Sequence, residues 1–161
     1  MSIAWCNGVW SETGEFALPL DSPGLRFGAG VFETLLYNGE RVCHLPLHLR
    51  RLSSTLDGFG FPLPDHPWHS IVREVATRNL PGGGPGRINV LCWFADAEGE
   101  LAIAVTARPT VRLGADATMR ISLEHAVERS PMPTLKTMNY LPHWLDWRRA
   151  KGSGFDNATI L

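Results

Sequence analysis

The chain carries strong turn signals between short apolar segments, and these signals limit how it can fold. Asn38-Gly39 is the strongest of them, because an Asn-Gly pair directly after the β-branched and aromatic segment 31–37 is typical of a tight hairpin. Two further apolar segments, 87–94 and 101–107, are joined through the turn residues 96–99. Hairpins connect antiparallel neighbours, so the sequence predicts an antiparallel sheet.

Leucines at helical spacing predict a helix over residues 46–57. Pro46 suits the first turn of this helix, and we expect its apolar face to be buried. Asp65 is the expected N-cap of a second helix that ends near residue 79. A third helix is expected over 139–151. The apolar face of the first helix consists of Leu45, Leu49, Leu52 and Leu56.

The remaining segments complete an α+β arrangement. A strand at 155–161 has no partner after the last helix, and one strand cannot form a sheet alone. We therefore divide the chain into an N-terminal α+β domain, residues 1–129, and the start of an incomplete second domain, residues 130–161. The other expected segments are a strand at 3–10 with a turn at Asn7-Gly8, a loop at 18–28, and strands at 41–44 and 119–123.

Composition excludes several classes of protein. A chain of 161 residues, 44% of them hydrophobic, suffices for one ordinary domain, or for one domain and part of another. The net charge of -1 gives no basic field for nucleic acid or an anionic membrane. No apolar run approaches the roughly 18 residues of a membrane span, and no signal peptide is recognisable. Cys6, Cys43 and Cys92 lack metal-like spacing, so we expect buried thiols in a reducing cytoplasm and no metal site.

Lys136 is one of only two lysines in the chain, against thirteen arginines. It lies between a strand-like and a helix-like segment. A lysine amine is a strong nucleophile only after it loses its proton, which burial or nearby cations favour. Its best-known use is a Schiff base with a carbonyl compound. The alternative interpretation is a solvated lysine at the start of a helix.

Three motifs occur in a fixed order along the chain. The first is DSPGLRFGAGVFET, residues 21–34; the second is HLRRL, residues 48–52, on the expected helix; the third is KTMNYL, residues 136–141. With these motifs the chain resembles the class IV aminotransferases, which are the fold-type IV pyridoxal-phosphate enzymes. The family includes branched-chain aminotransferases, D-amino-acid aminotransferases and 4-amino-4-deoxychorismate lyases. The resemblance implies the N-terminal α/β domain of such an enzyme, followed by the beginning of its cofactor-binding domain.

The resemblance implies a set of cofactor-binding residues. Lys136 matches the lysine that forms the aldimine with pyridoxal 5′-phosphate and moves the substrate proton. Arg51 matches the arginine that binds the cofactor phosphate, a task that suits a bidentate guanidinium. Tyr140 matches a tyrosine that hydrogen-bonds the phenolic oxygen of the cofactor, and it could share a helical face with Lys136. Arg51 could instead be a surface charge, and Tyr140 a core tyrosine.

Substrate-binding residues are also implied. Phe27 and Phe32 match positions that wall the substrate pocket, and Arg87 falls where relatives often carry a strand arginine near that pocket. Arg87 could equally be a surface charge at a strand end. Glu33 belongs to the first motif, but the alternate faces of a strand cannot both line one pocket. We assign no chemistry to His48.

The chain departs from the family pattern in two places. Relatives continue past the lysine helix and supply an acidic partner for the pyridine nitrogen, which keeps the ring an electron sink. In relatives, that region lies beyond the positions that match residue 161. Many relatives carry an Arg-Gly step after the strand arginine, where this chain has residues 91–96. The identity of the substrate therefore cannot be carried over.

We expect a pyridoxal-phosphate-dependent aminotransferase that acts on a small-molecule amino-acid substrate, with homodimers as in the family. One alternative is the lyase reaction of 4-amino-4-deoxychorismate lyase, which releases pyruvate. Another is a non-catalytic fragment or remnant of the family. A nucleotide-binding module based on Gly28-Ala29-Gly30 is disfavoured, because these glycines precede a strand rather than a helix.

Overall fold

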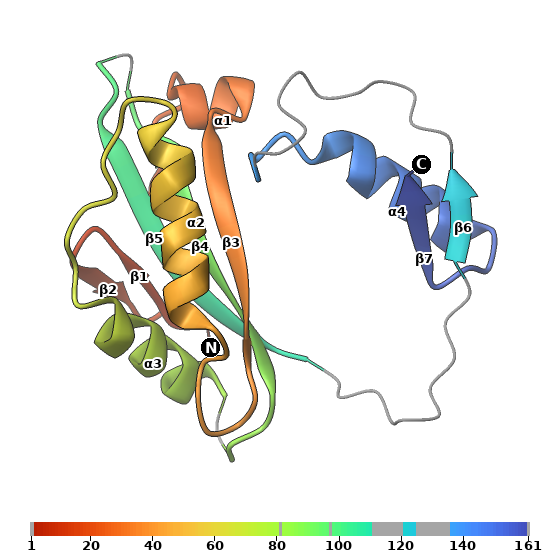
Figure 1. Cartoon of the computed structure of the whole chain (residues 1–161), viewed down its shortest axis with the longest axis horizontal. Helices are drawn as coiled ribbons and strands as arrows, with labels where there is room; N and C mark the ends of the chain where they lie inside the picture. Colours follow the sequence, from red (N-terminus) through yellow and green to blue (C-terminus); the bar gives the residue numbers. More distant parts are fainter. Residues whose placement is uncertain (1, 81, 97, 111–120, 125–135, 161) are drawn as a thin grey trace. The chain divides into compact units, whose positions relative to one another are not determined.

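The computed structural model contains two compact units, Met1–Arg112 with Lys136–Met138, and Leu113–Leu135 with Asn139–Leu161 (Figure 1). The predicted domain boundary between residues 129 and 130 lies outside the described residues, so that division stays a prediction. The structure describes residues 2–80, 82–96, 98–110, 121–124 and 136–160.

A five-stranded antiparallel sheet forms the centre of the first unit (Figure 1). Its strand order is β2-β1-β5-β4-β3, and every neighbouring pair runs antiparallel. The predicted antiparallel sheet and the α+β class are therefore confirmed. The strands are β1 (Ala4–Cys6), β2 (Val9–Ser11), β3 (Gly30–Tyr37), β4 (Gly86–Phe94) and β5 (Leu101–Pro109).

Two helices cover one face of this sheet. Helix α2 (Leu45–Asp57) packs against β3, and helix α3 (Trp68–Asn79) packs mainly against β5. The leucine face predicted for α2 is confirmed, with Leu49 packed at the edge of the core. Apolar side chains from both helices join one face of the sheet in a single core. Its members include Trp5, Val31, Leu35, Leu52, Leu56, Val72, Val75, Ile88, Val90, Ile103 and Val105.

Two tight turns contain Asn-Gly pairs, but only one of them joins two strands. Asn7 and Gly8 both adopt positive φ, 46° and 88°, as a type I′ turn between β1 and β2 requires. After Asn38-Gly39 the predicted strand at 41–44 is wrong. There Val42 forms one bridge with Tyr37. His44 then takes a left-handed conformation (φ 54°), which turns the chain into α2.

Two other local predictions were wrong. The expected loop at 18–28 contains a short helix, α1 (Pro23–Phe27), because Ser22 Oγ accepts the backbone N–H of Leu25 and Pro23 suits the first turn. Asp65 does not cap α3. The helix starts at Trp68, with Pro67 at the N-cap position and no side-chain cap, so Asp65 precedes the first turn.

Residues 136–138 pair with the outer edge of β3 and so extend the sheet sideways. The N–H of Phe32 donates to the carbonyl of Lys136 (3.0 Å), and the N–H of Met138 donates to the carbonyl of Gly30 (2.8 Å). Between them, Thr137 bridges to Val31 in antiparallel orientation. A Cβ at Gly30 would lie 2.5 Å from the carbonyl oxygen of Cys92 on β4 and 2.8 Å from Met138 Sδ, so glycine allows close contact on both sides. The backbone of Lys136 is thereby fixed to the strand of the first motif.

The second unit contains a parallel strand pair and a helix. Strand β6 (Ile121–Glu124) pairs with β7 (Asn157–Ile160), and helix α4 (Leu141–Gly152) packs against both strands. The final strand is therefore not unpaired, and that prediction was wrong. A helical connection brings the strand that follows it back parallel to the earlier one. Since α4 begins at Leu141, Lys136 does not share a helix with Tyr140, contrary to prediction.

Burial on α2 predicts a sharp difference between two leucines of the same helix. Leu52 is 1% exposed in the core, and Leu47 is 52% exposed. We expect Leu52→Ala to lower the free energy of unfolding by about 2–5 kcal/mol, through lost burial and a residual cavity. Leu47→Ala is the control and should change it by less than about 0.5 kcal/mol. Urea unfolding followed by circular dichroism measures both, and equal losses would contradict this packing.

Candidate functional site

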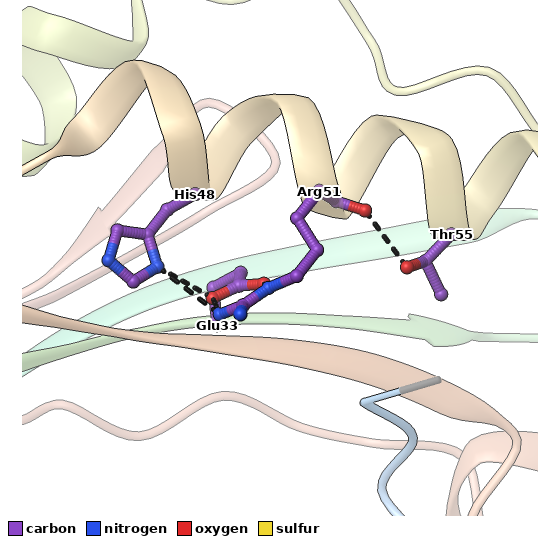
Figure 2. A network of polar contacts seen from close by, with 4 residues as sticks. All are labelled: Glu33, His48, Arg51 and Thr55. Atoms are coloured by element: carbon purple, nitrogen blue, oxygen red, sulfur yellow. Dashed lines mark hydrogen bonds and ion pairs between the residues drawn. The ribbon is translucent and has the colours of Figure 1, made fainter. Parts of the chain in front are cut away.

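A buried carboxylate connects β3 to α2. Glu33 lies on the core-facing side of β3, between the buried residues Val31 and Leu35, and its side chain is 2% exposed. Arg51 on α2 grips it with two nitrogens: Nε donates to Oε1 and Nη2 donates to Oε2, each at 2.5 Å (Figure 2). A bidentate pair of this kind fixes the plane of the guanidinium as well as its position.

His48 is the second partner of the same carboxylate. Its Nδ1 lies 2.7 Å from Glu33 Oε2 (Figure 2). His48 and Arg51 are three residues apart on α2, so both side chains reach the same side of the helix. Thr55, four residues after Arg51, donates its hydroxyl to the Arg51 carbonyl at 2.9 Å. We call Glu33, His48 and Arg51 the carboxylate cluster.

Electrostatics keep the carboxylate of this cluster ionised. Burial by itself raises the pKa of Glu33, but hydrogen bonds and positive charge from Arg51 and His48 outweigh burial. The pKa therefore lies below the ordinary glutamate value. A buried charge is tolerated only when it is paired and hydrogen-bonded in this way.

Lys136 lies at the β3 edge, beside the first motif. Its Nζ is 4.5 Å from the centroid of the Phe32 ring. Partial burial lowers the pKa of the Lys136 amine; the Glu33 carboxylate raises it, and the Arg51 guanidinium lowers it, with a net value below that of ordinary lysine. The amine consequently becomes neutral, and nucleophilic, at a lower pH than a solvated lysine does.

Adjacent residues of β3 contact these two groups. Phe32 and Glu33 are neighbours, and successive side chains of a strand point to opposite faces. The ring of Phe32 contacts the Lys136 amine, whereas Glu33 contacts Arg51 under α2. One strand therefore contacts both the amine and the guanidinium, and the charge of Arg51 lowers the pKa of Lys136.

The predicted substrate-pocket residues lie in different parts of the first unit. Phe32 is beside Lys136, as described. Phe27 ends α1 and is 62% exposed, with the guanidinium of Arg26 over its ring. Arg87 is exposed on β4, paired with Leu36 of β3. Four residues of register separate that pair from Phe32, which is about 13 Å along the strand.

Arg108 is a residue that the sequence did not single out. In the β4–β5 register it lies directly opposite Arg87, and both are exposed. Like charges directly opposite each other destabilise a sheet, so an anion between them would relieve the repulsion. Knowledge of the hairpin register was needed to find this pair.

Tyr140 belongs to the second unit. It occupies the N-cap position of α4 and is 43% exposed, and its ring centroid lies 4.5 Å from that of His143. Its predicted contact with the phenolic oxygen of a cofactor stays a prediction.

Glu33 and His48 were left without a role by the sequence. A signal was present: Val31, Leu35 and Tyr37 are apolar at alternate positions, so Glu33 falls on their buried face. A charged residue on a buried face requires a partner, and the basic residues of HLRRL on the next helix could supply it.

The described residues contain neither a cluster of metal ligands nor a helix that could span a membrane. Within them, no group of three or more His, Cys, Asp or Glu side chains could hold a metal ion. Among the same residues, no helix has both the length and the apolar character needed to cross a bilayer.

The family model of amino-transferase class IV matches residues 30–161. The match covers most of the chain, which therefore belongs to the class IV aminotransferase family. No curated protein sequence matches it.

Solved structures of low sequence identity share the fold. A hypothetical aminotransferase from Mycobacterium tuberculosis, with α-ketoglutarate and PMP bound, has a TM-score of 0.82 at 21% identity, covering 99% of this chain and 62% of that one. Branched-chain aminotransferase from Thermoproteus uzoniensis with norvaline has a TM-score of 0.80 at 24% identity, covering 100% and 60%. A fold IV transaminase from Curtobacterium pusillum has a TM-score of 0.77 at 20% identity, covering 95% and 58%. The chain thus spans about three fifths of their length.

The lowered pKa of Lys136 predicts its reactivity, with Lys151 as an internal comparison. Competitive labelling of the folded chain with acetic anhydride over a pH series, read by peptide mass spectrometry, gives the titration of each amine. We expect the midpoint of Lys136 to lie below the lysine value of about 10.4. A midpoint at or above that value would contradict the described surroundings of the amine.

The lowered pKa of Glu33 predicts a loss of stability in acid. The folded pKa lies below the unfolded value of about 4.3, so the carboxylate stabilises the fold fully above that pH. This contribution disappears as the pH falls through the folded pKa. We expect Glu33→Gln to lower the free energy of unfolding at pH 7 by about 1–3 kcal/mol and to flatten its dependence on pH below about 5. Parallel pH profiles for the two proteins would contradict the pairing.

Proposed function

We propose that the chain binds pyridoxal 5′-phosphate through Lys136 and Arg51 and serves in the transamination of an amino-acid substrate. The observation that carries this proposal is a partly buried lysine with a lowered pKa, held on the strand that also positions a guanidinium. Structural relatives add support, since the hypothetical aminotransferase from M. tuberculosis has a PLP-bound and a PMP-bound form.

The residues present fit the aldehyde and the phosphate of this cofactor. An aldehyde requires a neutral amine, and the surroundings of Lys136 favour that form. A phosphate requires a cation with several N–H donors. Arg51 provides one, with its side chain 55% exposed although one edge of its guanidinium binds Glu33.

When bound, the cofactor supplies an aldehyde that receives the substrate amino group and a conjugated ring that stabilises negative charge at the α-carbon. The chain supplies the groups that bind and move protons. In its neutral form, Lys136 Nζ would condense with the aldehyde and release water; once the substrate amino group had displaced it, the free amine would accept the α-proton of the substrate and, when protonated, return it. The ring of Phe32 lies beside this amine, with its centroid 4.5 Å from Nζ.

Three other residues complete the proposal. Phe27 is proposed to wall the substrate pocket, Arg87 to lie near that pocket, and Tyr140 to hydrogen-bond the cofactor ring oxygen. The pairing of Arg87 with Arg108 supports a preference for anions at that end of the sheet. These roles rest on the family resemblance and on the register of the sheet.

Covalent trapping tests the proposal directly. Treatment of the chain with pyridoxal 5′-phosphate and then borohydride, followed by peptide mapping, should place a reduced phosphopyridoxyl group on Lys136. The chain contains one other lysine, so Lys136→Ala should abolish the adduct and Lys151→Ala should leave it in place. An adduct at Lys151, or none, would overturn the proposal.

Product analysis separates transamination from the lyase alternative. A panel of amino donors should give keto acids in stoichiometric amounts if the chain transaminates. Release of pyruvate from aminodeoxychorismate, without keto-acid formation from the panel, would indicate the lyase reaction instead. Trapping at Lys136 without either product would identify a cofactor-binding chain that lacks catalysis.

A further inference from the structure

The carboxylate cluster contains more organisation than a stabilising ion pair requires. A buried ion pair adds little net stability, because removing two charges from water offsets their attraction. What the bidentate contact adds is orientation. Glu33 engages both Nε and Nη2 of Arg51, so the guanidinium plane is set by a carboxylate that is itself fixed on a sheet strand.

Contact with Glu33 restricts the rotamers of the long Arg51 side chain. It is 55% exposed, and an exposed arginine loses rotamer entropy when it binds a ligand. Contact with Glu33 removes this freedom before any ligand arrives, and preorganisation of that kind increases affinity. His48 orients the carboxylate in turn, through its 2.7 Å contact with Oε2.

We propose that Glu33 and His48 are positioning residues for the phosphate of pyridoxal 5′-phosphate, and that they act through Arg51 by fixing its guanidinium. The inference rests on the proposed function, because it takes Arg51 as the phosphate ligand. Neither residue is a catalytic residue, since each acts through the arginine.

Simple electrostatics and positioning predict opposite results for Glu33→Gln. The substitution removes a negative charge near the phosphate site, so Coulomb attraction alone would make phosphate binding tighter. If Glu33 instead positions Arg51, the substitution releases the guanidinium and weakens phosphate binding. The sign of the change therefore decides between them.

The experiment compares the binding of pyridoxal 5′-phosphate with that of pyridoxal, which lacks the phosphate. Absorbance titrations of the whole chain give a dissociation constant for each ligand. For Glu33→Gln we expect binding of pyridoxal 5′-phosphate to weaken about 5- to 50-fold, the span of coupling between contacting residues. Binding of pyridoxal should change little. Glu40→Gln, at an exposed turn position, is the matched control and should bind both ligands like the wild type.

Two further variants test the route of the effect. In an Arg51→Lys background, Glu33→Gln should add little further loss, because the arginine through which Glu33 acts is gone. His48→Gln should weaken pyridoxal 5′-phosphate by a smaller factor than Glu33→Gln and again spare pyridoxal. This variant also provides the test if Glu33→Gln does not fold, as circular dichroism would show.

The outcomes separate the two levels of the proposal. A wild-type chain that binds no pyridoxal 5′-phosphate overturns the proposed function and this inference together. If the wild type binds, the inference alone fails when the Glu33 variant binds pyridoxal 5′-phosphate equally well or more tightly. It fails too when both ligands weaken equally, or when the loss persists undiminished in the Arg51→Lys background.

Discussion

The pairing of the Glu33 carboxylate with basic side chains of helix α2 is the interaction on which the arrangement of the candidate site depends. Glu33 lies in an otherwise apolar face of β3, so the helix that covers it must provide positive or hydrogen-bonding partners. Arg51 and His48 meet that requirement from one side of α2. The contact determines how the helix sits over the strand and where the guanidinium lies, and it connects packing of the core to the chemistry of the site.

The outer edge of β3 has the complementary role. Residues 136–138 come from a distant part of the sequence and pair with Gly30 to Phe32 through backbone hydrogen bonds. Backbone hydrogen bonds as well as side-chain packing therefore fix the position of Lys136 relative to β3. Adjacent residues of β3 contact the amine and the guanidinium, and the charge of the guanidinium lowers the pKa of the amine. Two functional groups that are 85 positions apart in the sequence are in this way held by one strand.

The sequence predicted those parts of the fold that depend on local pattern. The β4–β5 hairpin, strand β3 and the leucine face of α2 follow from turn residues and periodicity within single segments. The errors depend on contacts between segments. His44 turns the chain out of the sheet, β6 gives β7 a partner, and Lys136 pairs with β3 rather than sharing a helical face with Tyr140. The role of Glu33 was missed for the same reason, since it depends on which residues of α2 lie over its face of the sheet.

A crystal structure of the chain with pyridoxal 5′-phosphate is the most direct test of this account. We predict a covalent bond from Lys136 Nζ to the cofactor, and phosphate oxygens about 2.7–2.9 Å from the Arg51 guanidinium. The contact between Arg51 and Glu33 should remain in place. A phosphate bound elsewhere, or an Arg51 side chain that leaves Glu33 to reach it, would contradict the claim that β3 positions both groups in advance.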